Sequence, residues 1–301
     1  MAKALQTKNT LDSSRPWWLM AAPVMFLFLW SGGYVVAKVG LMHSPPMTLL
    51  VLRYLCVVVL MAVLFVGIRP QLPATRQEWM HLVIVGLFMQ VMYFGMCYLA
   101  FMNGIGAGTA ALIMSLQPIL VAIIAPSWNS EHVSFRQWGG LLIALAGTAM
   151  VIFARSEIGA APMFGLLCAF VALAGISLAT LWEKRFGVTH HPVTANLIGY
   201  TAGLVGVVPL MFWLETPYVD WTWGFAAALG YLVIGNSLVA VWLLLAMIRA
   251  GEVSKVSALL FLVPPLAALL AWFVLGEVMP AFAWLGLLIS GAGVFLATRK
   301  W

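Results

Sequence analysis

Charged side chains are scarce in this 301-residue chain: Asp, Glu, Lys and Arg together make up 8 % of it. An ordinary globular domain carries about 25 %. Hydrophobic residues make up 64 % instead, enough for about ten stretches of the roughly 20 residues that cross a bilayer as a helix. The composition therefore excludes a sizeable soluble domain and indicates a multi-pass membrane protein.

The few cysteines and histidines form none of the patterns that metal or catalytic chemistry requires. Cys56, Cys97 and Cys168 lie singly in apolar runs without CxxC spacing, which argues against a disulfide framework and a zinc site. The five histidines fall in loops or at span ends, and neither HExxH nor GxSxG occurs. We therefore expect no enzyme, no metal and no cofactor. The net charge of +6 comes from scattered Lys and Arg, so nucleic acid is not an expected partner.

Breaks at charges, polar pairs and Pro/Gly clusters divide the chain into ten candidate helices. They cover residues 18–41, 48–68, 79–101, 105–127 and 135–154, then 163–186, 193–214, 222–248, 254–275 and 280–298. Residues 1–17 and 299–301 are expected to be short tails. With the N-terminus inside, twelve of the fifteen Lys and Arg residues lie on the inner side. This bias predicts that both termini are cytoplasmic.

The two halves of the chain repeat each other at a constant offset of 146 residues. Rare residues keep the register: Lys38 matches Lys184, Pro46 matches Pro192, Pro118 matches Pro264, Glu131 matches Glu277 and Trp138 matches Trp284. The pattern predicts two units, 18–154 and 155–298. Because each unit holds five spans, an odd number, the second is threaded in the opposite sense. Inverted repeats are the usual construction of secondary transporters.

Several landmarks recur in a fixed order along the chain. They are Trp30-Ser31-Gly32-Gly33 leading to Lys38, Pro45-Pro46 and Arg53, then Gly106 to Ala111 leading to Pro118, Glu131 with Gly139-Gly140, and Pro264-Pro265, Gly276-Glu277 and Gly286. Over residues 20 to 298 this order resembles the EamA type of the drug/metabolite transporter superfamily. The resemblance implies an all-α integral membrane fold of ten transmembrane helices, arranged as two inverted five-helix repeats around a central cavity. It also implies an exporter of the bacterial inner (plasma) membrane, similar to exporters of amino acids, including aromatic ones.

Polar and aromatic residues near span centres are the candidates for substrate contact, because polar side chains there are costly without a partner. Gln90 and Asn236 are equivalent at the 146 offset. Either they face one cavity from opposite sides, or they hydrogen-bond helix to helix. The remaining candidates are Trp30, Tyr34, Tyr93, Tyr98, Ser115, Gln117, Ser177, Trp242 and Phe261. Aromatic rings mixed with amides and hydroxyls suit a small molecule that is partly apolar and partly polar.

The placement of positive charge narrows the substrate class. Lys38, Arg53 and Lys184 lie near span ends, where long side chains reach the interface, and no Lys or Arg lies at a span centre. A neutral or zwitterionic substrate is therefore favoured over a phosphate-bearing one. Arg53, whose equivalent is Gly199, either meets a substrate carboxylate or caps neighbouring carbonyls. Lys38 and Lys184 are further candidates for a carboxylate contact or a gate.

Prolines within the fourth and ninth spans predict kinks near their centres, at Pro118 and at Pro264-Pro265. Such kinks act either as hinges or as static bends. None of the nine acidic residues lies at a span centre, so transport uses an unidentified coupling group or follows the substrate gradient.

The function predicted is export of small neutral or zwitterionic metabolites by alternating access, with amino acids foremost. The alternatives are an exporter of drugs, nucleosides or other amphipathic metabolites, and a lipid flippase or scaffold of the same fold. The expected partners are a small-molecule substrate and the lipid bilayer, with the chain acting as a monomer.

Overall fold

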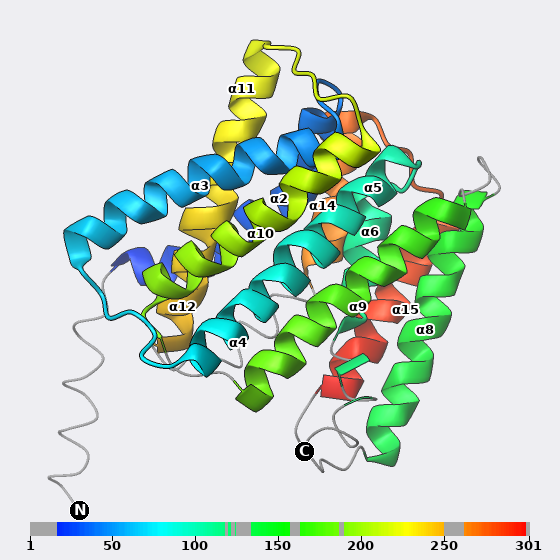
Figure 1. Ribbon diagram of the computed structural model, residues 1–301. Coiled ribbons are helices and arrows are strands. Elements are labelled where there is room, and N and C mark those ends of the chain that lie inside the picture. The colour runs from blue at the N-terminus through cyan, green and yellow to red at the C-terminus, as the bar shows by residue number, and fades with distance from the viewer. Residues whose placement is uncertain are drawn as a thin grey trace, which may run out of the picture.

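The computed structural model describes residues 17–117, 120–121, 124, 134–156, 163–186, 190–249 and 262–298, and every regular element in these residues is a helix (Figure 1). The first half contains α2 (Trp17–Leu41), α3 (Pro46–Ile68), the continuous run α4 (Arg76–Gly86), η1 (Leu87–Gly95) and α5 (Met96–Met102), then α6 (Ala107–Met114) and α8 (Phe135–Ser156). The second half contains α9 (Met163–Phe186), α10 (Pro192–Leu214), the run α11 (Trp223–Gly230), η2 (Tyr231–Ala240) and α12 (Val241–Arg249), then α14 (Val263–Leu275) and α15 (Ala281–Thr298). Six of the described helical runs are long and apolar enough to cross a membrane. The prediction of an all-α membrane fold is confirmed.

Prolines set several helix starts. Pro46 and Pro192 begin α3 and α10, because a proline in the first turn lacks only an N–H that has no helical partner there. Pro264 and Pro265 likewise lie in the first turn of α14. Residues 250–261, the first half of the predicted ninth span, lie outside the described residues, so the kink at Pro264-Pro265 stays a prediction. Pro118 lies outside the described residues.

The repeats are related by a two-fold arrangement between α8 and α15, which lie together at one side of the bundle (Figure 1). Gly147 and Gly293 are equivalent residues with reciprocal contacts. A Cβ added to Gly147 would lie 2.5 Å from the Gly286 carbonyl oxygen, and one added to Gly293 would lie 2.7 Å from that of Gly140. Gly286 is itself the equivalent of Gly140. Reciprocal contacts of this kind are the signature of a two-fold axis, and they run antiparallel, as inverted repeats require.

Two π-helical segments occupy equivalent positions in the third and eighth spans. The π-helix η1 (Leu87–Gly95), shifted by 146 residues, covers 233–241 and so overlaps η2 (Tyr231–Ala240). The sequence pattern predicted ordinary helix in both places. A π-helix releases backbone groups from the regular ladder and is frequent at functional sites. Gln90 lies in η1 and Asn236 in η2.

Helix α10 packs closely on the third span through a face that consists of glycines. A Cβ on Gly206 would lie 2.7 Å from Val91, and one on Gly86 of α4 would lie 2.7 Å from the Gly199 backbone. Gly203 meets Gln90 in the same way. Small residues at such spacing let membrane helices approach closely. The equivalents of Gly199, Gly203 and Gly206 in α3 are Arg53, Val57 and Leu60. Because these are bulky, α3 does not approach the eighth span in the same way.

Candidate functional site

Arg53 lies at the centre of the bundle with 1 % of its surface exposed. Its Nη1 donates to the Tyr98 hydroxyl at 3.0 Å, and its Nη2 donates to Asn236 Oδ1 at 2.9 Å. Nε and Nη2 donate to the Ser237 hydroxyl at 3.2 and 3.0 Å. The guanidinium also covers the ring of Phe94, 4.5 Å from its centroid. We call these five residues the central cluster.

The central cluster corrects the expectation that Arg53 lies near a span end and reaches the interface. The chain places its guanidinium against the middle of η2, because α3 begins two residues earlier than predicted and the long side chain points inward. All of its described contacts are with neutral groups. A buried charge without a counter-charge is costly, and a cation held in this way is ready to bind an anion.

Asn236 links the central cluster to α2. While its Oδ1 accepts from Arg53, its Nδ2 donates to the Leu29 carbonyl oxygen at 3.2 Å. Gly33 makes this approach possible, because a Cβ at that position would overlap the Asn236 carboxamide. Asn236 therefore bonds helix to helix and also orients Arg53.

Aromatic residues from the first and third spans surround a small central cavity of about 30 Å³ beside Arg53. The Tyr34 and Tyr93 hydroxyls share a hydrogen bond of 3.3 Å. The predicted residues that line this cavity are Trp30, Tyr34, Arg53, Tyr93, Tyr98 and Asn236. The structure thus brings six of the sequence candidates together around one buried cation.

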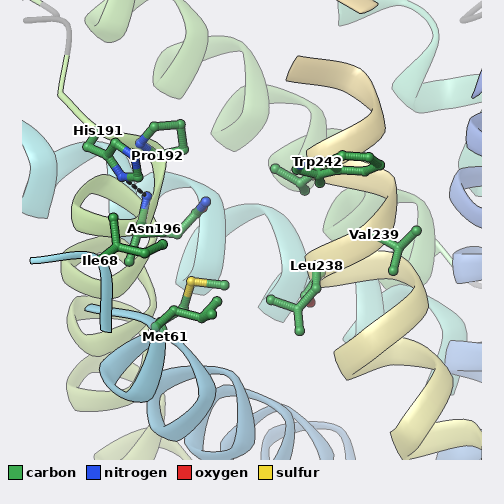
Figure 2. Close-up of a pocket in the computed structure, with 12 residues that line it drawn as sticks. Met61, Ile68, His191, Pro192, Asn196, Leu238, Val239 and Trp242 are labelled. Carbon is green, nitrogen blue, oxygen red and sulfur yellow. Dashed lines mark hydrogen bonds between the residues drawn. The ribbon is translucent and has the colours of Figure 1, made fainter. Parts of the chain in front are cut away.

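A larger opening, the side cavity, lies between α3 and α10 on one wall and η2 and α12 on the other, with a volume of about 580 Å³. Figure 2 shows Met61, Ile68 and Asn196 on the first wall and Leu238, Val239 and Trp242 on the second. Its lining is almost wholly apolar. Ser237, which binds Arg53, also lines it, so one side chain links the side cavity to the central cluster.

A third opening, the end cavity, has a volume of about 290 Å³ and lies among α4, η1, the end of α9 and the start of α10. Gln90 lines it and is 6 % exposed, and its Oε1 has no hydrogen-bond partner among the described residues. In this conformation Gln90 and Asn236 line different cavities, and of the two alternatives the helix-to-helix hydrogen bond is the one that Asn236 makes. The glycines of α10 draw η1 toward the end cavity, whereas Asn236 faces Arg53.

At the opposite end of the bundle, Lys38 forms an ion pair with Glu277. Glu277 also accepts from the Ala107 N–H at the start of α6, at 3.3 Å, where the helix dipole favours a negative charge. Glu277 thus binds both a basic side chain and a backbone donor that has no partner within its own helix. We call this the Lys38 end, and the end that carries the end cavity the His190 end.

The other sequence candidates lie away from the central cluster. Trp242 lines the side cavity and is 56 % exposed. Gln117 donates to the Thr180 hydroxyl at 2.7 Å, and Ser115 and Ser177 donate to carbonyls of their own helices. Phe261, Glu131 and the Lys184 side chain lie outside the described residues. The sequence interpretation missed Phe94, although this residue directly follows Tyr93, which it named.

The family of this chain follows from comparison with known proteins. The model of the EamA-like transporter family matches residues 16–153 and again 163–299. The chain belongs to this family. Two matches in one chain agree with the internal repeat, and the EamA fold is a ten-helix membrane fold of transporters, not enzymes.

Individual EamA relatives are distant in sequence but similar in length. "Uncharacterized transporter YvbV" of Bacillus subtilis (strain 168) is 25 % identical over 277 residues, covering 91 % of this chain and 89 % of that protein. A "Probable amino-acid metabolite efflux pump" of Salmonella typhimurium is 24 % identical over 284 residues, covering 91 % and 92 %. A solved crystal structure, 20 % identical, aligns with a TM-score of 0.62 over 93 % of this chain and 96 % of that one. That likeness shows the shared fold.

Proposed function

We propose that this EamA-like transporter exports small zwitterionic metabolites, with amino acids that carry apolar or aromatic side chains foremost, and that Arg53 binds the substrate carboxylate. The burial of Arg53 among neutral partners carries the proposal. A carboxylate that joins them supplies the missing counter-charge and accepts charge-assisted hydrogen bonds, with bidentate geometry available from a guanidinium. The Salmonella relative described as an amino-acid metabolite efflux pump supports the same substrate class.

The aromatic surroundings of Arg53 favour an apolar or aromatic substrate side chain. Trp30, Tyr34, Tyr93 and Phe94 line the small central cavity. Its volume of about 30 Å³ is too small for an amino acid, so we propose that substrate enters when the helices around it separate. The side cavity, joined to Arg53 through Ser237, offers space for the apolar part of the molecule.

We further propose that the His190 end faces the cytoplasm and that this conformation is closed toward the outside. The distribution of Lys and Arg supports this orientation, with twelve of fifteen on the inner side. At the Lys38 end, Glu277 ties Lys38 to α6, and Glu215 from the end of α10 accepts from the Thr48 hydroxyl at 2.7 Å. The equivalent of Glu215 at the other end is Arg69, which cannot accept such bonds.

A second candidate function is the movement of an amphipathic metabolite or lipid. The observation that favours it is the apolar lining of the side cavity, between helices long enough to span the membrane. Apolar cavities at membrane depth suit hydrocarbon groups.

Counterflow in proteoliposomes separates the two candidates. Purified protein is reconstituted with unlabelled phenylalanine inside, and uptake of radiolabelled phenylalanine is compared with translocation of a fluorescent phospholipid. Amino-acid exchange that is saturable and inhibited by other amino acids supports the first proposal. Lipid movement without amino-acid exchange contradicts it and supports the second.

A further inference from the structure

The end cavity carries chemistry that the central cluster does not use. Among the described residues that line it, the charged and titratable groups are Glu78, Glu183, His81, His190 and Tyr200. The glutamates give it a negative character, in contrast to the cation at Arg53. His190 Nε2 lies 3.8 Å from Glu78 Oε2 and has no hydrogen-bond partner among the described residues. Two side chains in this cavity thus have unmet hydrogen-bonding capacity.

Of these two side chains, Gln90 is the stronger evidence for a bound ligand, because it is buried in the protein. It is 6 % exposed, and its Oε1 is a buried acceptor without a donor. A buried carbonyl oxygen without a hydrogen-bond donor destabilises the folded protein by about 1–3 kcal/mol. Such atoms are rare in native proteins, and one that lines a cavity indicates that a bound molecule supplies the donor. The cavity that it lines is about 290 Å³, close to the lower limit of about 300 Å³ for small-molecule sites. A ligand that reaches Gln90 Oε1 must bring a hydrogen-bond donor.

The walls suit a positively charged donor in particular. Trp182 and Tyr200 present aromatic surface to the cavity, and aromatic faces attract ammonium groups. Trp182 is held in place by donating its Nε1–H to His81 Nδ1 at 3.2 Å, and His81 stacks on Phe186. The carboxylates therefore supply charge preference, the fixed rings supply cation–π surface, and Gln90 supplies an acceptor.

The end cavity also adjoins the apolar side cavity. Pro192, Asn196 and Val241 line both, and Figure 2 shows Asn196 and Pro192 on the wall of the side cavity. One molecule can therefore keep a polar group among the glutamates and extend an apolar group past Asn196 toward Leu238 and Trp242.

We propose that the end cavity is an ammonium-binding subsite that takes aryl- and alkylammonium groups, distinct from the carboxylate site at Arg53. The inference goes beyond the proposed function. The end cavity and the cavity beside Arg53 share no lining residue, and an α-amino acid carries both charged groups on one carbon atom, so a single amino acid does not fill both sites at once. A compound that has only the amine occupies the end cavity alone.

The test uses two probes that each carry one charged group on the same apolar frame. Binding of radiolabelled 2-phenylethylamine and of 3-phenylpropionate to the full-length purified protein is measured by scintillation proximity. Glu183→Gln, which changes a carboxylate that has no described bond within the protein, is expected to weaken phenylethylamine binding about tenfold, the size of a charge-assisted interaction. Glu78→Gln keeps the acceptor for the Ala74 N–H and is expected to act in the same direction. Asp220→Asn, at the Lys38 end, is the matched control and leaves amine binding unchanged.

Gln90→Leu gives an independent readout. It removes the orphaned acceptor, so amine binding should fall severalfold while the melting temperature stays equal or rises. A merely structural Gln90 would lower the melting temperature instead.

Unchanged phenylethylamine binding in both glutamate variants, or no amine binding by the wild type, overturns the subsite. Arg53→Gln separates this failure from that of the proposed function. It should abolish phenylpropionate binding while amine binding persists. Retained phenylpropionate binding in Arg53→Gln contradicts the carboxylate site. The ammonium subsite is then judged separately, by phenylethylamine binding to Glu78→Gln and Glu183→Gln.

Discussion

Tyr54 and Tyr200, which hold the same position in the two repeats, meet edge to face between α3 and α10 with their ring centroids 5.5 Å apart. Equivalent residues touch each other only where a two-fold axis passes close by. Gly147 and Gly293 mark the same relation between α8 and α15. Equivalent helices of the two repeats thus pack on each other at two places, α3 on α10 and α8 on α15. The differences between the halves are departures from this symmetry.

The first prediction concerns the α8–α15 contact. Gly293→Ala should destabilise the protein by about 1–3 kcal/mol, the usual cost of overpacking, because its Cβ would meet the backbone of Ala144 and Gly140. Gly291→Ala is the control in the same helix, since a Cβ there meets nothing within 4 Å. Thermal unfolding in detergent measures both. Equal melting temperatures for the two variants would show that the close α8–α15 contact does not form.

The second prediction concerns the glycine face of α10. Gly203→Ala should lower the melting temperature and push α10 away from η1, because the added Cβ overlaps the Gln90 side chain. Gly67→Ala in α3 has open space around it and should be neutral or slightly stabilising. A Gly203→Ala variant as stable as Gly67→Ala would contradict the explanation given for the difference between the halves.

The third prediction concerns closure of the Lys38 end. Glu277→Gln keeps an acceptor for the Ala107 N–H but loses the ion pair with Lys38. Cys97 lines the small central cavity and is 3 % exposed. In a background without Cys56 and Cys168, Cys97 should react severalfold faster with a membrane-impermeant maleimide in Glu277→Gln, as expected for a partly buried pair worth about 1 kcal/mol.

The His43–Asp220 pair at the same end provides the control. Asp220 is well exposed, with 64 % of its side chain accessible, so Asp220→Asn should leave the Cys97 rate unchanged. Equal acceleration by both variants would mean that loss of charge at this end, not the Lys38–Glu277 contact, controls access.

Position along each span predicted which aromatic residues meet, because residues near span centres converge in a bundle whose repeats share one axis. Tyr34, Tyr93 and Tyr98 are examples. The depth of Arg53 was not predictable from its distance to the span end, since that distance ignores the length and direction of the side chain. Its contacts come from η2, η1 and α5, and a π-helix has no sequence signal of its own.

The separation of Gln90 from Asn236 has a different origin. Exact repeat symmetry predicts that both face one space. The packing of α10 on α4 and η1 depends on Gly199, Gly203 and Gly206, and these residues break the symmetry because their equivalents in α3 are large. The sequence shows that these glycines are present, but their role follows only from the structure, which shows that they face the third span.

The most direct test of the account is substrate discrimination by Arg53. Counterflow of phenylalanine is compared with that of phenylalaninamide, which lacks the carboxylate, in proteoliposomes of wild type, Arg53→Lys and Arg53→Gln. Wild type should prefer phenylalanine, Arg53→Lys should keep a weakened preference because a point charge loses the bidentate geometry, and Arg53→Gln should lose phenylalanine exchange at least about tenfold. Arg53→Gln that folds and exchanges phenylalanine as fast as wild type would contradict the carboxylate site.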